Sequence, residues 1–404
     1  MKIGIWISEG FNPQVGGGAS YLERLLLAID SYAFDEEVEI CYVTRKNTEL
    51  PFQRPVIHLP YLRRELTKKE KMQCRLPFMR EKIYAVAEER RKENEHQRDI
   101  QVLNDEHVGL IVYPTQLCCE IEGFPFVAMN WDIGHWSTYA FPELCANVEY
   151  EERSAFYTNV LPKALLVCCE SEAGKQELLQ YTNLNEDKIE VVPLFAGNCV
   201  NITLAEKEQS EILKQYGLEK EKFFFYPAQF WAHKNHTNLL KAFAIFSEKY
   251  AEYKLVLVGA DKGNLGYVKQ KAEELKIADK VVFPGFVPQE HINTFYKNAA
   301  ALTMVTFFGP TNMPPLEAME LGCPIIATDI KGHREQLGDA AIYIDALDVK
   351  SIAAAMEEMV SKRASYMERI SQQKEKTWFT IDNALTELNK AFVKVVQLRR
   401  AWEL

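Results

Sequence analysis

Short apolar runs recur along the whole chain in two successive series, and this pattern limits the possible folds more than any other feature. The runs are rich in β-branched and aromatic residues and are apolar on both faces, which is typical of strands buried in parallel sheets. The first series consists of 2–8, 38–44, 108–114, 124–131, 164–170 and 188–194, and the second of 222–229, 254–259, 280–285, 300–306, 324–328 and 341–345. The sequence therefore predicts two sheets, one for each series.

Helix-like segments separate most of these runs. Strands that alternate with amphipathic helices form parallel sheets covered on both faces, so the predicted fold class is α/β with two Rossmann-like, doubly wound domains. The chain has 404 residues, more than one core usually holds. We expect a first domain at 1–196, a second at 197–380 and a helical tail at 381–404. Ligands of such sheets bind beyond the carboxyl ends of the strands, so two facing domains would enclose a cleft there.

Charge and composition exclude several classes of protein. A net charge of -10 argues against bulk nucleic-acid binding. The N-terminal apolar run is too short for a signal sequence, and no stretch approaches the roughly 20 apolar residues that span a bilayer. We therefore expect a cytoplasmic protein. The nine cysteines lack the spacing of metal ligands, so no metal site is expected.

Segment 62–82 differs from the rest of this acidic chain because it holds eight Lys or Arg residues against three acids. Apolar residues are interleaved with these charges, and such a segment can rest on an anionic membrane surface. A solvated helix face explains the same charges. Both interpretations stay open, and the first would place the protein at the inner face of the cell membrane.

Segment 307–329 reads as a strand end, a Gly/Pro turn, a short helix and another strand. Pro residues at 314 and 315 suit the first turn of that helix, which places Glu317 near its start. A carboxylate there can accept hydrogen bonds from two ribose hydroxyls, although it could also merely complement the helix dipole. The loop amides of Thr311, Asn312 and Met313 can face a phosphate.

Two further loops after strands carry chemistry. Lys234 lies at a loop-to-helix junction, where an ammonium can neutralise charge on a leaving diphosphate; a solvated lysine is the alternative. The neighbouring Phe230 and Trp231 could wall a cleft or pack between helix and sheet. In the first half, Gly17 and Gly18 precede a helix-like segment beginning at Tyr21, and glycines there let backbone amides approach an anion closely.

Asp132 and His135 share one loop after the run at 124–131. A carboxylate and an imidazole near a sugar can orient hydroxyls or manage an acceptor proton. A histidine with a purely structural role is the other interpretation.

The order of the motifs in the second half carries a resemblance. The pairs and runs Lys234-Asn235, Leu257-Val258-Gly259, Val282-Phe-Pro-Gly-Phe-Val and Pro314-Pro-Leu-Glu-Ala-Met follow one another at characteristic spacings. The chain resembles a retaining glycosyltransferase of the GT-B type, similar to glycosyltransferase family 4 and to its bacterial polysaccharide enzymes. The likeness covers nearly the whole length.

The resemblance implies roles for particular residues. Glu317 would hold the ribose, Lys234 the diphosphate, and the backbone at Phe286 and Val287 the base. Gly17 and Gly18 would border the phosphates, and His135 with Asp132 would lie near the transferred sugar. The chain departs from the family pattern at Thr306, where a second glutamate is usual, and at Gln229, where an arginine is usual.

The implied reaction is transfer of a sugar from a nucleotide-diphosphate sugar to a hydroxyl group of a glycan, a lipid-linked sugar or a protein. The acceptor attacks from the face that the diphosphate leaves, with retention at the anomeric carbon and with no cofactor or metal. The absence of an Asp-x-Asp triplet agrees with metal independence. Two alternatives remain: an inactive nucleotide-sugar-binding protein, and an epimerase or phosphorylase on the same scaffold. By family analogy the tail at 381–404 would cross back onto the first domain.

Overall fold

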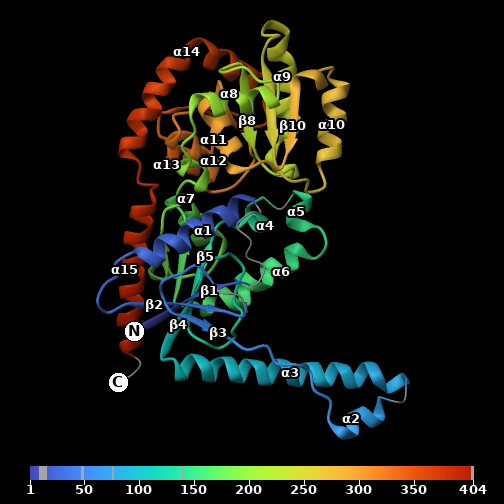
Figure 1. The fold of residues 1–404 in the computed structure, drawn as a ribbon, viewed down its shortest axis with the longest axis vertical. Helices are drawn as coiled ribbons and strands as arrows, with labels where there is room; N and C mark the ends of the chain where they lie inside the picture. Colours follow the sequence, from blue (N-terminus) through green and yellow to red (C-terminus); the bar gives the residue numbers. More distant parts are fainter. Residues whose placement is uncertain (9–15, 47–49, 75–76, 139, 402–404) are drawn as a thin grey trace.

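The computed structural model describes residues 1–8, 16–46, 50–74, 77–138 and 140–401. It contains two parallel sheets in two lobes, one above the other (Figure 1). The seven-stranded sheet of the first lobe has the order β3-β2-β1-β4-β5-β6-β7, and the six-stranded sheet of the second lobe has the order β10-β9-β8-β11-β12-β13. Both orders reverse beside their first strand, which is the doubly wound arrangement that the sequence predicts.

Every predicted apolar run contains a strand. The strands are β1 (Lys2–Ile7), β2 (Glu39–Thr44), β3 (Val56–His58), β4 (Val108–Tyr113), β5 (Phe126–Asn130), β6 (Leu166–Cys169), β7 (Ile189–Val191), β8 (Phe223–Pro227), β9 (Lys254–Val258), β10 (Val281–Gly285), β11 (Ala301–Met304), β12 (Ile325–Thr328) and β13 (Ala341–Ile344). Only β3 was not predicted from the sequence. It is a three-residue edge strand, too short to show a hydrophobic period.

Helices cover both faces of each sheet. The α-helices are α1 (Gly16–Ser31), α2 (Lys68–Gln73), α3 (Pro77–Asp105), α4 (Gly134–Ser137), α5 (Pro142–Cys145), α6 (Glu149–Ala155), α7 (Glu172–Tyr181), α8 (Glu206–Gln215), α9 (His236–Lys249), α10 (Leu265–Glu274), α11 (Gln289–Asn298), α12 (Met313–Glu320), α13 (Lys331–Leu337), α14 (Val349–Lys376) and α15 (Ile381–Arg400). Short 3-10 or π turns complete the connections, and one of them, Ala232–Lys234, precedes α9.

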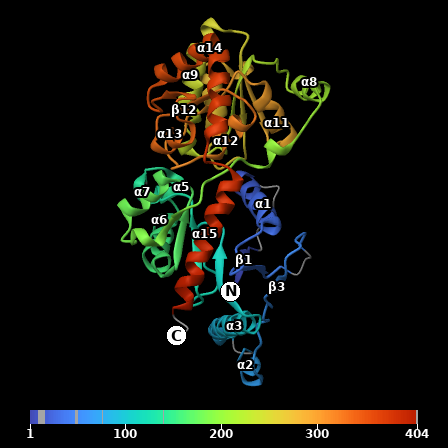
Figure 2. The ribbon, with the colours of Figure 1, turned by 90° about the vertical axis from the view of Figure 1, so that its left-hand side faces the viewer.

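The last two helices join the lobes. α14 packs on the second lobe and is kinked at Lys362, and α15 then runs down the first lobe (Figure 2). Phe392 of α15 stacks on Phe34 with ring centroids 5.7 Å apart, and the Lys394 ammonium donates to the Asp187 carbonyl at 2.7 Å. The C-terminal helix therefore lies on the first lobe.

An arm made of α2 and α3 extends from the first lobe (Figure 1). Pro77 begins α3, so the basic segment 62–82 is divided between α2 and α3, and α3 continues to Asp105, beyond the end of that segment. Asp99 anchors α3 to the lobe through an ion pair with Arg45. Among the described residues, no helix has the length and apolar character needed to cross a membrane.

The strand order fixes where the loops gather. In each sheet the strand order reverses between two neighbouring strands, and the loops that follow these two strands run in opposite directions. A crevice therefore opens beyond the carboxyl ends of these two strands. In the second lobe these are β8 and β11, which lead to Lys234 and to the loop 306–312. In the first lobe β1 leads to α1, which begins at Gly16 and not at Tyr21. Residues 9–15, the start of the Gly-rich loop, lie outside the described residues.

Candidate functional site between the lobes

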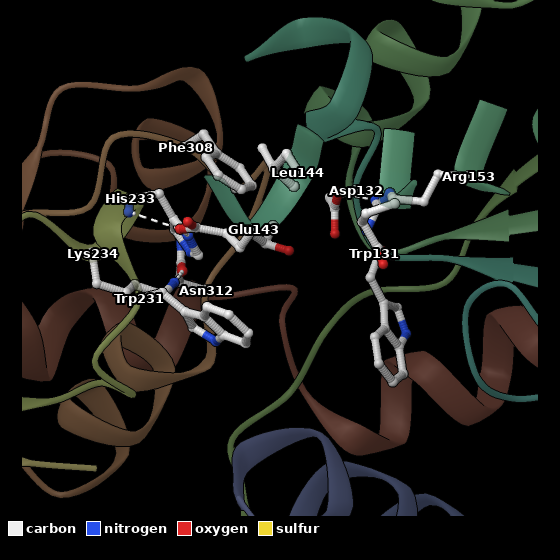
Figure 3. Close-up of a pocket in the computed structure, with 13 residues that line it drawn as sticks. Trp131, Asp132, Glu143, Leu144, Arg153, Trp231, His233, Lys234, Phe308 and Asn312 are labelled. Atoms are coloured by element: carbon white, nitrogen blue, oxygen red, sulfur yellow. Dashed lines mark hydrogen bonds and ion pairs between the residues drawn. The ribbon is translucent and has the colours of Figure 1, made fainter. Parts of the chain in front are cut away.

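Two adjoining pockets open between the lobes, and Figure 3 shows the first of them. The first, which we call the Asp132 pocket, has a volume of about 380 Å³, and the second, the Gly18 pocket, about 390 Å³. They share one wall made of Trp131, Trp231, His233, Lys234, Thr311 and Asn312. Residues from both sheets thus meet around one space, as the facing-domain prediction required.

Lys234 is the cation on the shared wall. Its ammonium donates to the Asn312 side-chain carbonyl at 3.3 Å, which is a neutral partner. Burial lowers the pKa of Lys234 to about 8, and the carboxylates of Asp132 and Glu143 oppose that shift. At neutral pH the ammonium is therefore largely charged, and no carboxylate of a described residue contacts it, which favours an anionic ligand.

The loop that leads into α12 forms the other half of the shared wall. Thr311 lines both pockets, and Met313 lines the Gly18 pocket. The backbone of Asn312 is fixed by the Gln336 side chain, which donates to its carbonyl at 2.9 Å and accepts from its amide at 3.3 Å. The Asn312 side chain also contacts the His333 ring at 3.1 Å. The loop is thus held by α13 before any ligand arrives.

Contacts across the cleft hold the two lobes together. The Glu143 carboxylate of α5 accepts from the His233 amide at 2.9 Å and also pairs with the His233 ring (Figure 3). Burial, and then the charge of Lys234, lower the pKa of His233 to about 2, so the ring is neutral and donates to the carboxylate. On the other side, the Glu335 carboxylate accepts from the amides of Glu172 and Ala173 at the start of α7, each at 2.9 Å.

The predicted glycines lie in the first turn of α1. Gly18 lines the Gly18 pocket, and a Cβ at this position would lie 3.6 Å from the Trp131 ring. Gly17 precedes it in the same helix. The start of a helix with no side chain in its first turn offers amide donors to an anion.

Asp132 and His135 have different surroundings. Asp132 lines the Asp132 pocket, accepts from the Gly134 amide at 2.8 Å and forms a 2.5 Å ion pair with Arg153. His135 is fully buried beneath this loop, with its ring 4.8 Å from Trp136 and 5.0 Å from Tyr157, and it lines neither pocket. Burial lowers its pKa to about 4. In this conformation only the carboxylate faces the cleft.

Glu317 lies in α12 with its carboxylate against Tyr296 and the Gly197 backbone. It accepts from the Tyr296 hydroxyl at 2.8 Å, and burial raises its pKa. It is absent from the lining of both pockets, as are the predicted base-contacting residues. Of those, Phe286 is exposed and Val287 is buried.

Gln229 and Thr306, the two residues that depart from the family pattern, lie in different surroundings. Gln229 lines the Gly18 pocket and accepts from the Trp231 indole at 3.0 Å. Thr306 is fully buried, donates to the Phe308 carbonyl at 3.0 Å and does not reach the cleft. Of the two aromatic residues beside Gln229, Trp231 walls the cleft whereas Phe230 packs on His236 in the core.

Several lining residues were not identified from the sequence. They include Tyr21, Trp131, Glu143, Arg153, Glu170, His233 and Phe308. Glu143 and His233 stand 90 residues apart, and no local spacing relates them. Within the described part of the chain, no group of three His, Cys, Asp or Glu residues is arranged to hold a metal ion.

Comparison with protein families and sequences supports the interpretation of the second lobe. Residues 208–377 match the family model described as Glycosyl transferases group 1. O-antigen chain mannosyltransferase B of Escherichia coli is 24% identical over 250 residues, which cover 61% of this chain and 64% of that protein. O-antigen chain mannosyltransferase RfbU of Salmonella typhimurium is 28% identical over 182 residues, 45% of this chain and 47% of that protein. The chain thus spans less than two thirds of the length of either relative.

Solved structures share the whole architecture. Sucrose-phosphate synthase from Thermosynechococcus elongatus superposes with a TM-score of 0.69 at 15% identity, over 98% of this chain and 99% of that one. Anabaena Alr3699/HepE in complex with UDP and glucose gives a TM-score of 0.69 at 16% identity, over 98% and 100% of the two chains. The two lobes therefore have the GT-B fold.

Proposed function

We propose that this chain is a retaining glycosyltransferase of family 4 that moves a sugar from a nucleotide-diphosphate sugar to a hydroxyl acceptor. The observation that carries the proposal is Lys234, a half-buried ammonium on the wall common to both pockets, with a neutral amide as its hydrogen-bond partner. The family match over 208–377 and the names of the mannosyltransferase relatives support the same class of reaction.

The diphosphate of the donor would lie between Lys234, the loop at 311–313 and the first turn of α1. Negative charge develops on the diphosphate as the glycosidic bond breaks, and a fixed cation with amide donors stabilises that charge more than it stabilises the ground state. The acceptor hydroxyl would enter through the Asp132 pocket and attack from the face that the diphosphate leaves. Neither a protein nucleophile nor a metal is required in this scheme.

The remaining site assignments follow from the same pose. Glu317 would bind the ribose after its carboxylate turns from Tyr296, and Phe286 with Val287 would border the base. Asp132 would orient a hydroxyl of the acceptor. His135 would act near the sugar only if the loop above it moved. We also propose that 1–196 and 197–380 are the two domains, with 381–404 returning to the first.

The acceptor is proposed to be a growing glycan or a lipid-linked sugar. The relatives from Escherichia coli and Salmonella typhimurium are both named O-antigen chain mannosyltransferases. One of the similar solved structures is a complex with UDP and glucose. These names describe those proteins, and they direct the choice of donors and acceptors to test on this chain.

A donor panel tests this function. We expect one nucleotide class among uridine, guanosine and thymidine diphosphate sugars to raise the Tm of the chain, and the same donor to be consumed only when a polysaccharide or lipid-linked acceptor is present, with EDTA included. The anomeric configuration of the product, measured by NMR, should match that of the donor.

Other outcomes of this panel would favour the alternatives. Binding with no turnover on any acceptor extract would favour an inactive binding protein. Release of free sugar without acceptor dependence would favour an epimerase or phosphorylase. If no nucleotide sugar binds, the proposed function is wrong.

We also propose that the arm rests on an anionic membrane. Lys68, Lys69 and Lys71 are exposed on α2 beside Met72, whose surface is 65% exposed. Each lysine near such a surface contributes about 1 kcal/mol, so changing all three to glutamate should release the protein from vesicles that contain phosphatidylglycerol. Flotation assays measure this, with phosphatidylcholine vesicles as the control. Equal flotation of the variant would contradict the proposal, and its donor binding should stay unchanged because the arm is far from the cleft (Figure 1).

A further inference from the structure

Glu170 follows β6 at its carboxyl end and lines the Gly18 pocket, as Lys234 and Thr311 of the second lobe also do. Its residue surface is only 3% exposed, and neither carboxyl oxygen makes a hydrogen bond to a described residue. The amide of Glu170 itself and the Thr311 hydroxyl of the facing lobe lie close enough to lower the pKa of the carboxyl group, but neither has the geometry of a hydrogen bond to it. A buried polar group in this state needs a partner, because leaving it unpaired costs free energy.

Burial shifts the Glu170 carboxyl group towards its protonated form. Burial raises its pKa well above the usual range, and the nearby Asp132 carboxylate adds to the rise. Neither Glu170 oxygen is hydrogen-bonded to the Lys234 ammonium, whose charged form is favoured by Asp132 and Glu143. A protonated carboxyl group has one donor and free acceptor capacity. It therefore matches a ligand group that can both accept and donate.

The backbone around Glu170 holds this side chain in place. The Glu170 carbonyl accepts from the Leu194 amide at 3.1 Å, and Ser171 caps α7 through the Gly174 amide at 2.9 Å. Gly174 carries no Cβ, and one built there would lie 3.3 Å from the Glu170 carboxyl oxygen. The carboxyl group is thus fixed between the start of α7 and the cleft.

On the basis of the proposed function, we infer that Glu170 binds a hydroxyl group of the transferred sugar and so determines which sugar the Gly18 pocket accepts. Sugar hydroxyls both donate and accept, whereas a diphosphate only accepts. The other hydrogen-bonding parts of the donor, ribose and base, are assigned to Glu317 and to 286–287, which do not line this pocket. Glu170 is therefore a specificity-determining contact on the first lobe, facing the diphosphate contacts on the second.

Two substitutions separate this role from a structural one. Glu170→Leu removes the hydrogen bond at similar volume, and Glu170→Gln keeps a neutral group that both donates and accepts. We expect the leucine variant to bind the nucleotide sugar about tenfold more weakly while binding the nucleoside diphosphate as the wild type does. The glutamine variant should stay within about threefold of wild type for both ligands. The Tm of the leucine variant should equal or exceed that of the wild type, because an unpaired buried acid is lost.

Donors that each lack one sugar hydroxyl identify the contact. In the wild type, one deoxy donor should bind about tenfold more weakly than the donor that keeps all its hydroxyls. In Glu170→Leu, the same two donors should bind equally well, which shows that the missing hydroxyl pairs directly with Glu170. An equal loss for nucleotide sugar and nucleoside diphosphate, or no loss for either, would overturn the inference. If the leucine variant does not fold, Glu170→Asp, which shortens the acid by one CH2 group, gives the same comparison. Absence of donor binding in the wild type would instead contradict the proposed function.

Discussion

Replacing Lys234 with alanine should lower kcat/KM by about a hundredfold or more while the chain stays folded. The ammonium is the only described cation on the wall shared by the two pockets, and its contact there is the neutral side chain of Asn312. Its loss removes charge stabilisation where negative charge develops on the leaving diphosphate. The folded state should not suffer, because a half-buried charge without a carboxylate in contact stabilises it little. Steady-state kinetics and a thermal melt measure the two effects.

The pH dependence gives this prediction a second test. With a pKa of about 8 in the free protein, the ammonium of Lys234 loses its charge as the pH rises further, so wild-type kcat/KM should fall above pH 8. Lys234→Arg keeps its charge at that pH, and whatever activity it retains should not fall there. The stability of the fold should change with pH in the opposite direction to the activity. Between the folded pKa and the unfolded value of about 10.4, the unfolded chain binds more protons, so the free energy of unfolding should rise with pH in the wild type but not in the alanine variant.

Wild-type activity of the alanine variant, or a kcat/KM of the wild type that stays flat above pH 8, would contradict the role of Lys234. A variant that is inactive because it is unfolded would be recognised by its melt.

Replacing Gly332 with alanine should destabilise the chain by about 3 kcal/mol and weaken donor binding as well. Gly332 lies in α13, and a Cβ there would be 1.2 Å from the Pro310 carbonyl oxygen and 2.3 Å from its carbon. Because the obstacle is backbone, the loop must move, and that loop continues directly into Thr311 and Asn312. The substitution therefore links a packing defect outside the cleft to the geometry of the site.

The matched control is Gly266→Ala in α10, where nothing lies within 4 Å of the added Cβ. This change should stabilise the chain by about 0.5 kcal/mol and leave donor affinity unchanged. Urea unfolding measures the change in the free energy of unfolding for both variants. If Gly332→Ala unfolded at the same urea concentration as the wild type, the loop at Pro310 could move without loss of stability. The claim that α13 holds Asn312 rigidly would then be wrong.

Local patterns were sufficient to predict the fold. Apolar runs mark strands because a strand buried on both faces must be apolar throughout, and the two series separate at one point in the chain. The same reasoning found Lys234, Asp132, Gly18 and the loop at 311–313, since each follows a strand and the carboxyl ends of parallel strands meet. These residues do meet in the cleft.

Other features could not be predicted because they depend on contacts between distant segments. The pairing of Glu143 with His233 crosses the lobes, and neither residue lies in a motif. Glu170 was included in an apolar run, where nothing marks its carboxyl group as unpaired. His135 and Glu317 were proposed from their places after strands as well as by resemblance, and in this conformation both side chains contact aromatic residues of their own lobes. Short motifs give the loop on which a side chain lies but not its direction.

The central claim is that one diphosphate lies between the lobes at Lys234. A crystal structure with the bound nucleoside diphosphate tests it most directly. We expect density for the two phosphates within hydrogen-bond distance of the Lys234 ammonium, beside Asn312 and the first turn of α1. Phosphate density elsewhere, for example against Arg90 and Arg91 in the pocket beside α3, with the wall around Lys234 empty, would contradict the claim.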